Sequence, residues 1–184
     1  MLQWLKRRTQ NSRRASELYG SVVAAARRPL FYEGFGVPDT PEGRFELVAL
    51  HLFLALESIK DRGEAEHDLA RRTIESFVTD MDDCMREMGV GDLAVPKKVK
   101  RAAAVFYERA ATYRRRLAEA APEGLEESLR RDVFAGAPLD KAGAAALARY
   151  VRAAASSLRA QSIETFVADG GQDRLLAGSS REVP

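Results

Sequence analysis

The segment 45–59 is apolar on nearly every side of a helix, and this feature constrains the fold most. Apolar residues recur at helical spacing along one face, and the leucines at 47, 50 and 54 cover much of the other. Glu46, His51 and Glu57 interrupt the run, which is shorter than the ~20 residues of a membrane span. We therefore expect a central, buried helix here, with His51 as a hydrogen-bonded core residue rather than a ligand.

Apolar stripes at helical spacing predict further helices around this one. Thr40 and Pro41 have the residue types of an N-cap and a first helical position, so the central helix should begin there. The others are expected over 16–28, 65–89, from 96, over 122–133 and from 140. The expected core is centred on Leu52, Phe53, Leu56, Phe77 and Phe106.

This pattern predicts an all-α, compact single-domain bundle of about six helices. Strand-like alternation is not seen in the sequence, and a hydrophobic content of 46% with 30% charged residues is typical of globular chains. The expected organisation is a flexible basic segment over 1–14, an all-α domain over 15–169 and a flexible tail over 170–184.

Charge is unevenly spread, although the net charge is only +2. Residues 1–28 hold seven Lys or Arg against one Glu, and residues 95–120 hold eight against two. Between them, residues 61–92 hold ten Asp or Glu against four Arg. The basic parts are either solvated faces or surfaces for nucleic acid or an anionic membrane. Likewise, Trp4 and Leu5 with the cations after them form either a weak interfacial anchor or a solubilising leader.

Residue sets typical of catalysis are incomplete in this sequence. Glu64 and His67 match one Glu-x-x-His unit of a di-iron site, which needs a second unit and two further glutamates. The run 80–83 is similar to the aspartate-rich magnesium sites of prenyl transferases, but it has no second copy. Cys84 is alone and lies among carboxylates, which favours a buried structural thiol over a nucleophile. We predict no enzyme activity, no cofactor and no metal; an isoprenoid-type enzyme is kept as an alternative.

Two segments are candidates for binding a partner. The loop 31–39 carries three aromatic residues, Phe31, Tyr32 and Phe35, which should either pack on the core or contact a partner. The helix from residue 96 begins with a cluster of cations: Lys97, Lys98, Lys100 and Arg101. Cations at the positive end of a helix dipole are locally unfavourable, which suggests a docking surface there.

Three stretches of the chain carry unusual sequence. Residues 30–52 are LFYEGFGVPDTPEGRFELVALHL, residues 80–93 are DMDDCMREMGVGDL followed by VPKKVK at 95–100, and residues 139–152 are LDKAGAAALARYVR. The first two strongly, and the third more weakly, resemble the ubiquinol–cytochrome c chaperone family of alphaproteobacterial type. Members of this family are assembly factors of respiratory complex III.

The resemblance implies a non-catalytic chaperone that binds newly made cytochrome b and assists assembly of ubiquinol–cytochrome c reductase. It implies a cytoplasmic protein whose further candidate partners are the ribosome, the anionic inner membrane, contacted peripherally, and another assembly factor. A basic helical protein that binds RNA or the ribosome is the alternative. We predict one contiguous docking region, made of Phe31, Tyr32, Phe35, Asp39, Glu87, Asp92, Lys97, Lys98, Lys100 and Arg101.

Overall fold

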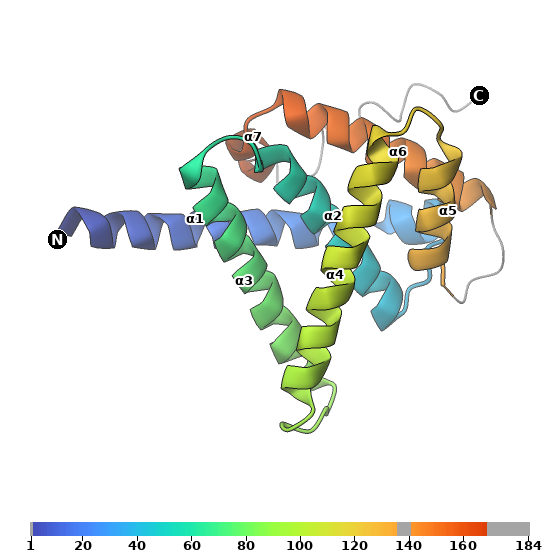
Figure 1. Cartoon of the computed structure of the whole chain (residues 1–184). Coiled ribbons are helices and arrows are strands. Elements are labelled where there is room, and N and C mark those ends of the chain that lie inside the picture. Colours follow the sequence, from blue (N-terminus) through green and yellow to red (C-terminus); the bar gives the residue numbers. More distant parts are fainter. Residues whose placement is uncertain (1, 136–140, 169–184) are drawn as a thin grey trace.

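The structure, a computed structural model, describes residues 2–135 and 141–168 (Figure 1). Within these ranges the chain forms seven α-helices and one π-helical turn, and no strand. In chain order they are α1 (Leu2–Ala26), η1 (Leu30–Gly34), α2 (Pro41–Ile59), α3 (Glu64–Glu87), α4 (Val95–Ala118), α5 (Glu123–Asp132), α6 (Lys141–Ala160) and α7 (Ile163–Ala168). The predicted all-α fold is confirmed. The tail expected at 170–184 and the expected start of α6 at residue 140 lie outside the described residues.

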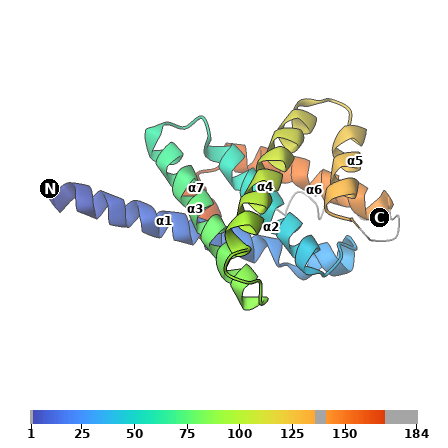
Figure 2. The ribbon, with the colours of Figure 1, turned by 60° about the horizontal axis from the view of Figure 1, so that its bottom comes forward.

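The helices pack around α2, with α1 and α3 on one side and α6 on another. The N-terminal half of α1 extends beyond the body of the molecule (Figure 1). Helices α3 and α4 pack as an antiparallel hairpin whose tip points away from the remaining helices in both ribbon views (Figure 2). None of the described helices combines the length and the apolarity that crossing a bilayer requires.

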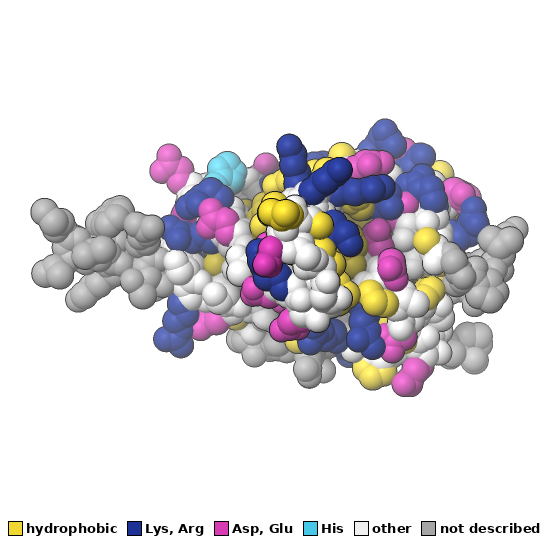
Figure 3. Space-filling view, turned by 90° about the horizontal axis from the view of Figure 1, so that it is seen from below, with side chains coloured by type: hydrophobic (Ala, Val, Ile, Leu, Met, Phe, Trp, Pro, Cys, Tyr) yellow, Lys and Arg dark blue, Asp and Glu magenta, His cyan; other side chains and the backbone are white. Residues whose placement is uncertain are grey.

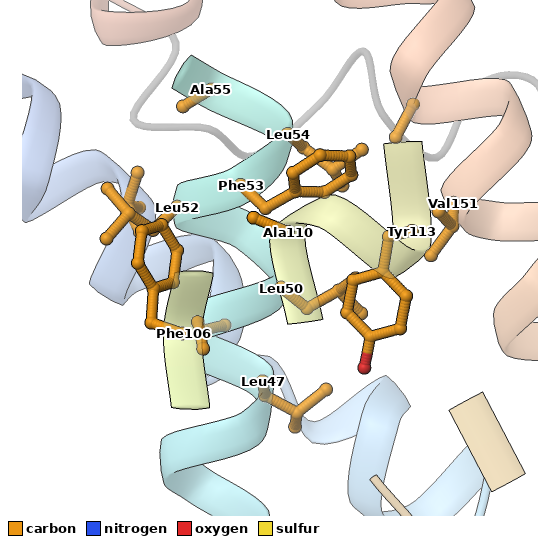
Figure 4. Close-up of a cluster of buried hydrophobic side chains, with 14 of the residues drawn as sticks. Leu47, Leu50, Leu52, Phe53, Leu54, Ala55, Phe106, Ala110, Tyr113 and Val151 are labelled. Carbon is orange, nitrogen blue, oxygen red and sulfur yellow. The ribbon is translucent and has the colours of Figure 1, made fainter. Parts of the chain in front are cut away.

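Helix α2 is the predicted central helix, and leucines on several of its sides are fully buried. Leu52 and Phe53 lie close to Phe106 and Tyr113 of α4, so that the two helices share one core (Figure 4). Phe77 of α3 joins it, since its ring centroid is 5.4 Å from that of Phe106. Leu56, by contrast, is only partly buried. A helix that is apolar all round gives no indication of which side lies at the edge of the core.

The predicted start of α2 is confirmed in detail. Thr40 has extended backbone angles, its side-chain oxygen accepts a hydrogen bond of 3.1 Å from the backbone N–H of Gly43, and Pro41 is the first helical residue. This side-chain bond satisfies one of the N–H groups that a helix leaves unpaired at its start.

Helix α1 is longer than expected, because it begins at Leu2 instead of residue 16. The sequence has no glycine or proline before Gly20, so nothing in residues 2–16 interrupts the helix. The flexible character assigned to residues 1–14 stays a prediction.

Candidate functional site

An open groove lies between the α3–α4 hairpin and the junction of α1, η1 and α2, and it has a volume of about 1150 Å³. Viewed from below, hydrophobic side chains lie beside the tip of the hairpin, with acidic side chains next to them (Figure 3). We call this feature the hairpin groove. It is lined by side chains from α1, the segment 29–39, the first turns of α2, the second half of α3 and the middle of α4.

The floor of the hairpin groove is apolar and rich in methionine. Phe45 and Phe77 stack with their ring centroids 6.1 Å apart. Met81 of α3 is buried, Met85 is half-buried, and Met88, the C-cap residue, is 61% exposed. The exposure of the methionines therefore increases toward the end of the helix. The three methionines form one stripe at helical spacing. In the structure its first member is core and its last is surface. Unbranched, polarisable methionine side chains adapt to partners of varied shape.

The walls of the groove carry an excess of negative charge. Six carboxylates line it, against three arginines. Two of these arginines are already paired: Arg44 with Asp39 at 2.6 Å, and Arg109 with Asp132 at 3.0 Å. The exposed Glu33, Glu42 and Glu87 form no ion pair with any residue that the structure describes.

Glu46 is a largely buried carboxylate among these six, with a side chain only 12% exposed. Its nearest cation is Arg109, whose Nε lies 3.5 Å from Glu46 Oε2, which is too long for a good hydrogen bond. Both of these atoms are buried and lack a hydrogen-bond partner among the described residues. Burial therefore raises the pKa of Glu46, and the nearby guanidinium compensates only in part.

Glu57, the other acidic residue buried on α2, is a carboxylate whose oxygens both accept hydrogen bonds. It accepts a hydrogen bond of 2.8 Å from Arg114 and another from Lys60. Although burial alone would raise its pKa, these two cations lower the pKa below its ordinary value. By contrast, the hydrogen-bonding capacity of the Glu46 carboxylate is not met by the described residues.

Cys84 is a correction to the sequence analysis, because it is exposed on α3 at the groove rather than buried. The stripe of α3 that enters the core passes through Phe77 and Met81, and residue 84 lies beside it. Partial desolvation, together with the carboxylates of Asp80 and Glu87, raises the pKa of the thiol. A protonated thiol is a poor nucleophile, so a catalytic role for Cys84 is disfavoured.

The aromatic segment forms the turn η1, and two of its three rings are core residues. Phe31 is fully buried, with its ring centroid 5.0 Å from that of His51 and 5.1 Å from that of Tyr150. Phe35 is 9% exposed and lies edge-on to Phe31. Phe31 and Phe35, predicted as partner contacts, thus present little or no surface to a partner in this structure. The core can hold both rings because α6 approaches the segment closely at Gly143.

The rest of the predicted docking region divides into two parts. Tyr32 and Asp39 line the hairpin groove together with Glu87, so loop and helix end do meet. The cations Lys97, Lys98, Lys100 and Arg101 are exposed at the start of α4 but do not line the groove. Asp92 is exposed at the hairpin tip and pairs with Arg86 at 2.5 Å. Glu46, Phe45 and Val48 also line the groove but were not among the predicted site residues, although the sequence shows Glu46 as a charge within an apolar helix.

The acidic and histidine motifs of the sequence have structural partners. Asp80 accepts a hydrogen bond of 2.7 Å from the hydroxyl of Tyr19, and Asp82 accepts one of 2.6 Å from Arg86. His67 is exposed, and its Nε2 lies 2.7 Å from the carbonyl oxygen of Lys60. In the described part of the chain no three His, Cys, Asp or Glu side chains are grouped so that they could hold a metal ion.

His51 is the hydrogen-bonded core histidine that the sequence predicted. Its Nδ1 lies 2.8 Å from the carbonyl oxygen of Leu47 and its Nε2 lies 2.8 Å from the hydroxyl of Tyr150. Because a carbonyl only accepts, Nδ1 carries the proton, and Nε2 of the neutral ring accepts from the tyrosine. Complete burial is the main cause that lowers the pKa of His51 from 6.5 to about 4.

This burial predicts a pH dependence of stability. Between about pH 6.5 and pH 4, His51 becomes protonated in the unfolded chain but stays neutral in the folded chain. The free energy of unfolding therefore falls as the pH falls. The expected loss is about 3 kcal/mol over this window. Urea unfolding at several pH values measures it, and the contribution should vanish in His51→Gln. The Tyr150→Phe variant keeps the imidazole and serves as control, because it should lose stability yet retain the slope. Equal slopes in the wild-type chain and in His51→Gln would contradict a neutral buried imidazole.

An all-α domain with an open groove of adaptable apolar side chains is typical of proteins that bind another polypeptide. The sequence profile of the ubiquinol-cytochrome C chaperone family matches residues 33–172, and the chain belongs to this family. It is similar to the Cbp3 homolog from Brucella abortus, whose crystal structure matches with a TM-score of 0.78 at 35% sequence identity and 94% coverage of each chain. A comparison with curated proteins gives no match. The resemblance drawn from the sequence is thereby confirmed.

Proposed function

We propose that the chain binds newly made cytochrome b and assists assembly of ubiquinol–cytochrome c reductase, without catalysing a reaction. The observation that carries this proposal is the open hairpin groove, with its graded methionines, in a member of a chaperone family. A chaperone must cover apolar surface of its client for a limited time, and adaptable side chains at a solvent-open groove suit that task.

The exposed cations at the start of α4 supply a second surface in this proposal. Lys97, Lys98 and Lys100 stand outside the groove, so they are free to face an anionic inner membrane or the ribosome while the groove holds a client. The protein is then cytoplasmic and touches the membrane peripherally. Another assembly factor is a further candidate partner for the surfaces that remain.

The same basic cluster also supports a second candidate function, the binding of RNA. Such a protein would bind RNA with an affinity that falls steeply as salt is raised, and its loss would leave cytochrome b unaffected. An isoprenoid-type enzyme finds less support in the geometry, because Asp80 and Asp82 are engaged by Tyr19 and Arg86.

Deletion of the gene in its own host, followed by an assay of assembled cytochrome b, tests the proposed function. We expect a marked loss of assembled cytochrome b and full recovery with the wild-type gene. Complementation with Lys97→Glu, Lys98→Glu and Lys100→Glu combined should recover it only in part, because reversed charges repel an anionic surface. Exposed charges contribute little to stability, so this triple variant should melt at nearly the wild-type temperature.

Two outcomes would contradict these expectations. Normal cytochrome b in the deletion strain would reject the proposed function. Full recovery with the triple variant at ordinary expression would show that the basic cluster is only a solvated face, while leaving the chaperone role in place.

A further inference from the structure

The hairpin groove is larger and more open than a typical pocket for a small metabolite. Pockets for small ligands usually enclose about 300–1,000 Å³ and bury most of the ligand surface. The hairpin groove measures about 1150 Å³ and is partly open to solvent between the hairpin and the α1–α2 junction. A segment of polypeptide fits a partly open groove of this size better than a single compact molecule does.

The fold also selects the conformation of such a segment. An extended peptide that binds by strand addition needs the free edge of a sheet, and the described part of this chain contains no strand. An amphipathic helix satisfies its own backbone hydrogen bonds and needs only an apolar groove for one face. Phe45, Val48, Met81 and Met85 provide such a floor between helices.

Charge then specifies the occupant further. The exposed Glu33, Glu42 and Glu87 stand at the groove without ion-pair partners among the described residues. Within it, Glu46 presents a buried carboxylate oxygen that makes no hydrogen bond with the described residues. Leaving a buried polar atom unpaired costs free energy, and an incoming cationic donor removes that cost.

We propose that the hairpin groove binds a short basic amphipathic helix of the client. The apolar face of this helix lies on Met81, Met85 and Phe45, one of its Lys or Arg side chains reaches Glu46, and its other cations face the acidic walls. This inference rests on the proposed function and deepens it, because it states the chemistry of the client segment that is recognised. The cations of α4 lie outside the groove and so do not repel this segment at close range.

The proposal is tested by direct binding of synthetic peptides to the full-length protein. The probe is a fluorescent amphipathic peptide of about 16 residues, long enough to form a helix, with Leu and Ala on one face and Lys on the other. A matched peptide carries Glu in place of every Lys. Fluorescence anisotropy should show that the Lys peptide binds at least about tenfold more tightly than the Glu peptide, and the difference should shrink as salt is raised.

Three variants of the protein locate the binding site. Glu46→Gln keeps the shape of the side chain and removes its charge, and it should weaken the Lys peptide about tenfold or more. Met85→Arg places a cation on the floor and should abolish binding. Glu108→Gln, which removes an exposed carboxylate of α4 outside the groove, is the matched control and should bind as the wild-type chain does. Melting temperatures are compared first, and Glu46→Gln decides the question if Met85→Arg does not fold.

Equal binding of the two peptides, or wild-type affinity in both groove variants, overturns the proposal. A third result would also overturn it: the protein is a dimer, and its groove binds the peptide only after residues 1–14 are removed. In that case the basic N-terminal segment of a second copy would be the occupant of the groove. These results are independent of the deletion experiment. If the peptide does not bind but the deletion strain loses cytochrome b, only the inference about the groove fails and the proposed function stands. If the peptide binds but the deletion strain keeps its cytochrome b, the proposed function is rejected and peptide binding by the groove stands.

Discussion

Replacing Phe53 by alanine is expected to lower the free energy of unfolding by about 3–5 kcal/mol. The ring is 2% exposed on the central helix α2, and its centroid lies 5.9 Å from that of Tyr113 on α4. Removing it deletes apolar surface buried between the two helices and leaves a cavity, because a close-packed core relaxes only in part. Urea unfolding should show a lower midpoint with little change in the slope against denaturant.

Leu93→Ala is the matched control for this measurement. Leu93 is fully exposed at the tip of the α3–α4 hairpin, so its truncation should change the stability by less than about 0.5 kcal/mol. Similar midpoints for Phe53→Ala and Leu93→Ala would contradict the placement of Phe53 in the shared core of α2 and α4.

The fold could be predicted from the sequence because its determinants are local. The periodicity of apolar residues gave the helices, and the pair Thr40–Pro41 gave the start of α2, since an N-cap acts within its own first turn. His51 was recognisable as a core residue because a polar ring on an apolar helix must find hydrogen-bond partners when it is buried. Its second partner, Tyr150, lies 99 residues away in the sequence, and only the packing of α6 on α2 reveals it.

The site could be predicted only in part, because a groove is a property of how helices pack. The sequence indicated Tyr32, Asp39 and Glu87, and the structure brings these three together at the hairpin groove. It could not show that Phe31 turns inward, since an aromatic residue in a loop is equally compatible with a core position and a surface position. Nor could it show that Glu46 lines the groove with an oxygen that lacks a hydrogen bond, because that depends on the 3.5 Å separation from Arg109 on another helix.

Replacing Gly143 by alanine should destabilise the protein by about 3 kcal/mol or more, because the close approach of α6 to η1 leaves no space for a methyl group. A Cβ at this position would lie 2.1 Å from the carbonyl oxygen of Phe35 and 3.2 Å from Cε1 of Phe134. Alanine favours a helix over glycine by about 1 kcal/mol, but the clash with a backbone atom outweighs this gain. Relief requires the segment around Phe35 to move away from α6.

Such a movement would also displace the wall of the hairpin groove, because Tyr32 and Asp39 belong to the same segment as Phe35. Gly143→Ala should therefore lower both the unfolding midpoint and the affinity for the Lys peptide. Gly43→Ala provides an independent check, since a Cβ there would lie 2.1 Å from the carbonyl oxygen of Pro38, at the other end of the segment. Gly20→Ala is the control: a Cβ built there would meet nothing within 4 Å apart from its chain neighbours and its own helix backbone, so alanine at this position inside α1 should leave stability unchanged or raise it by up to about 1 kcal/mol. If Gly143→Ala and Gly20→Ala had the same effect, η1 would not be held against α6 as the structure describes.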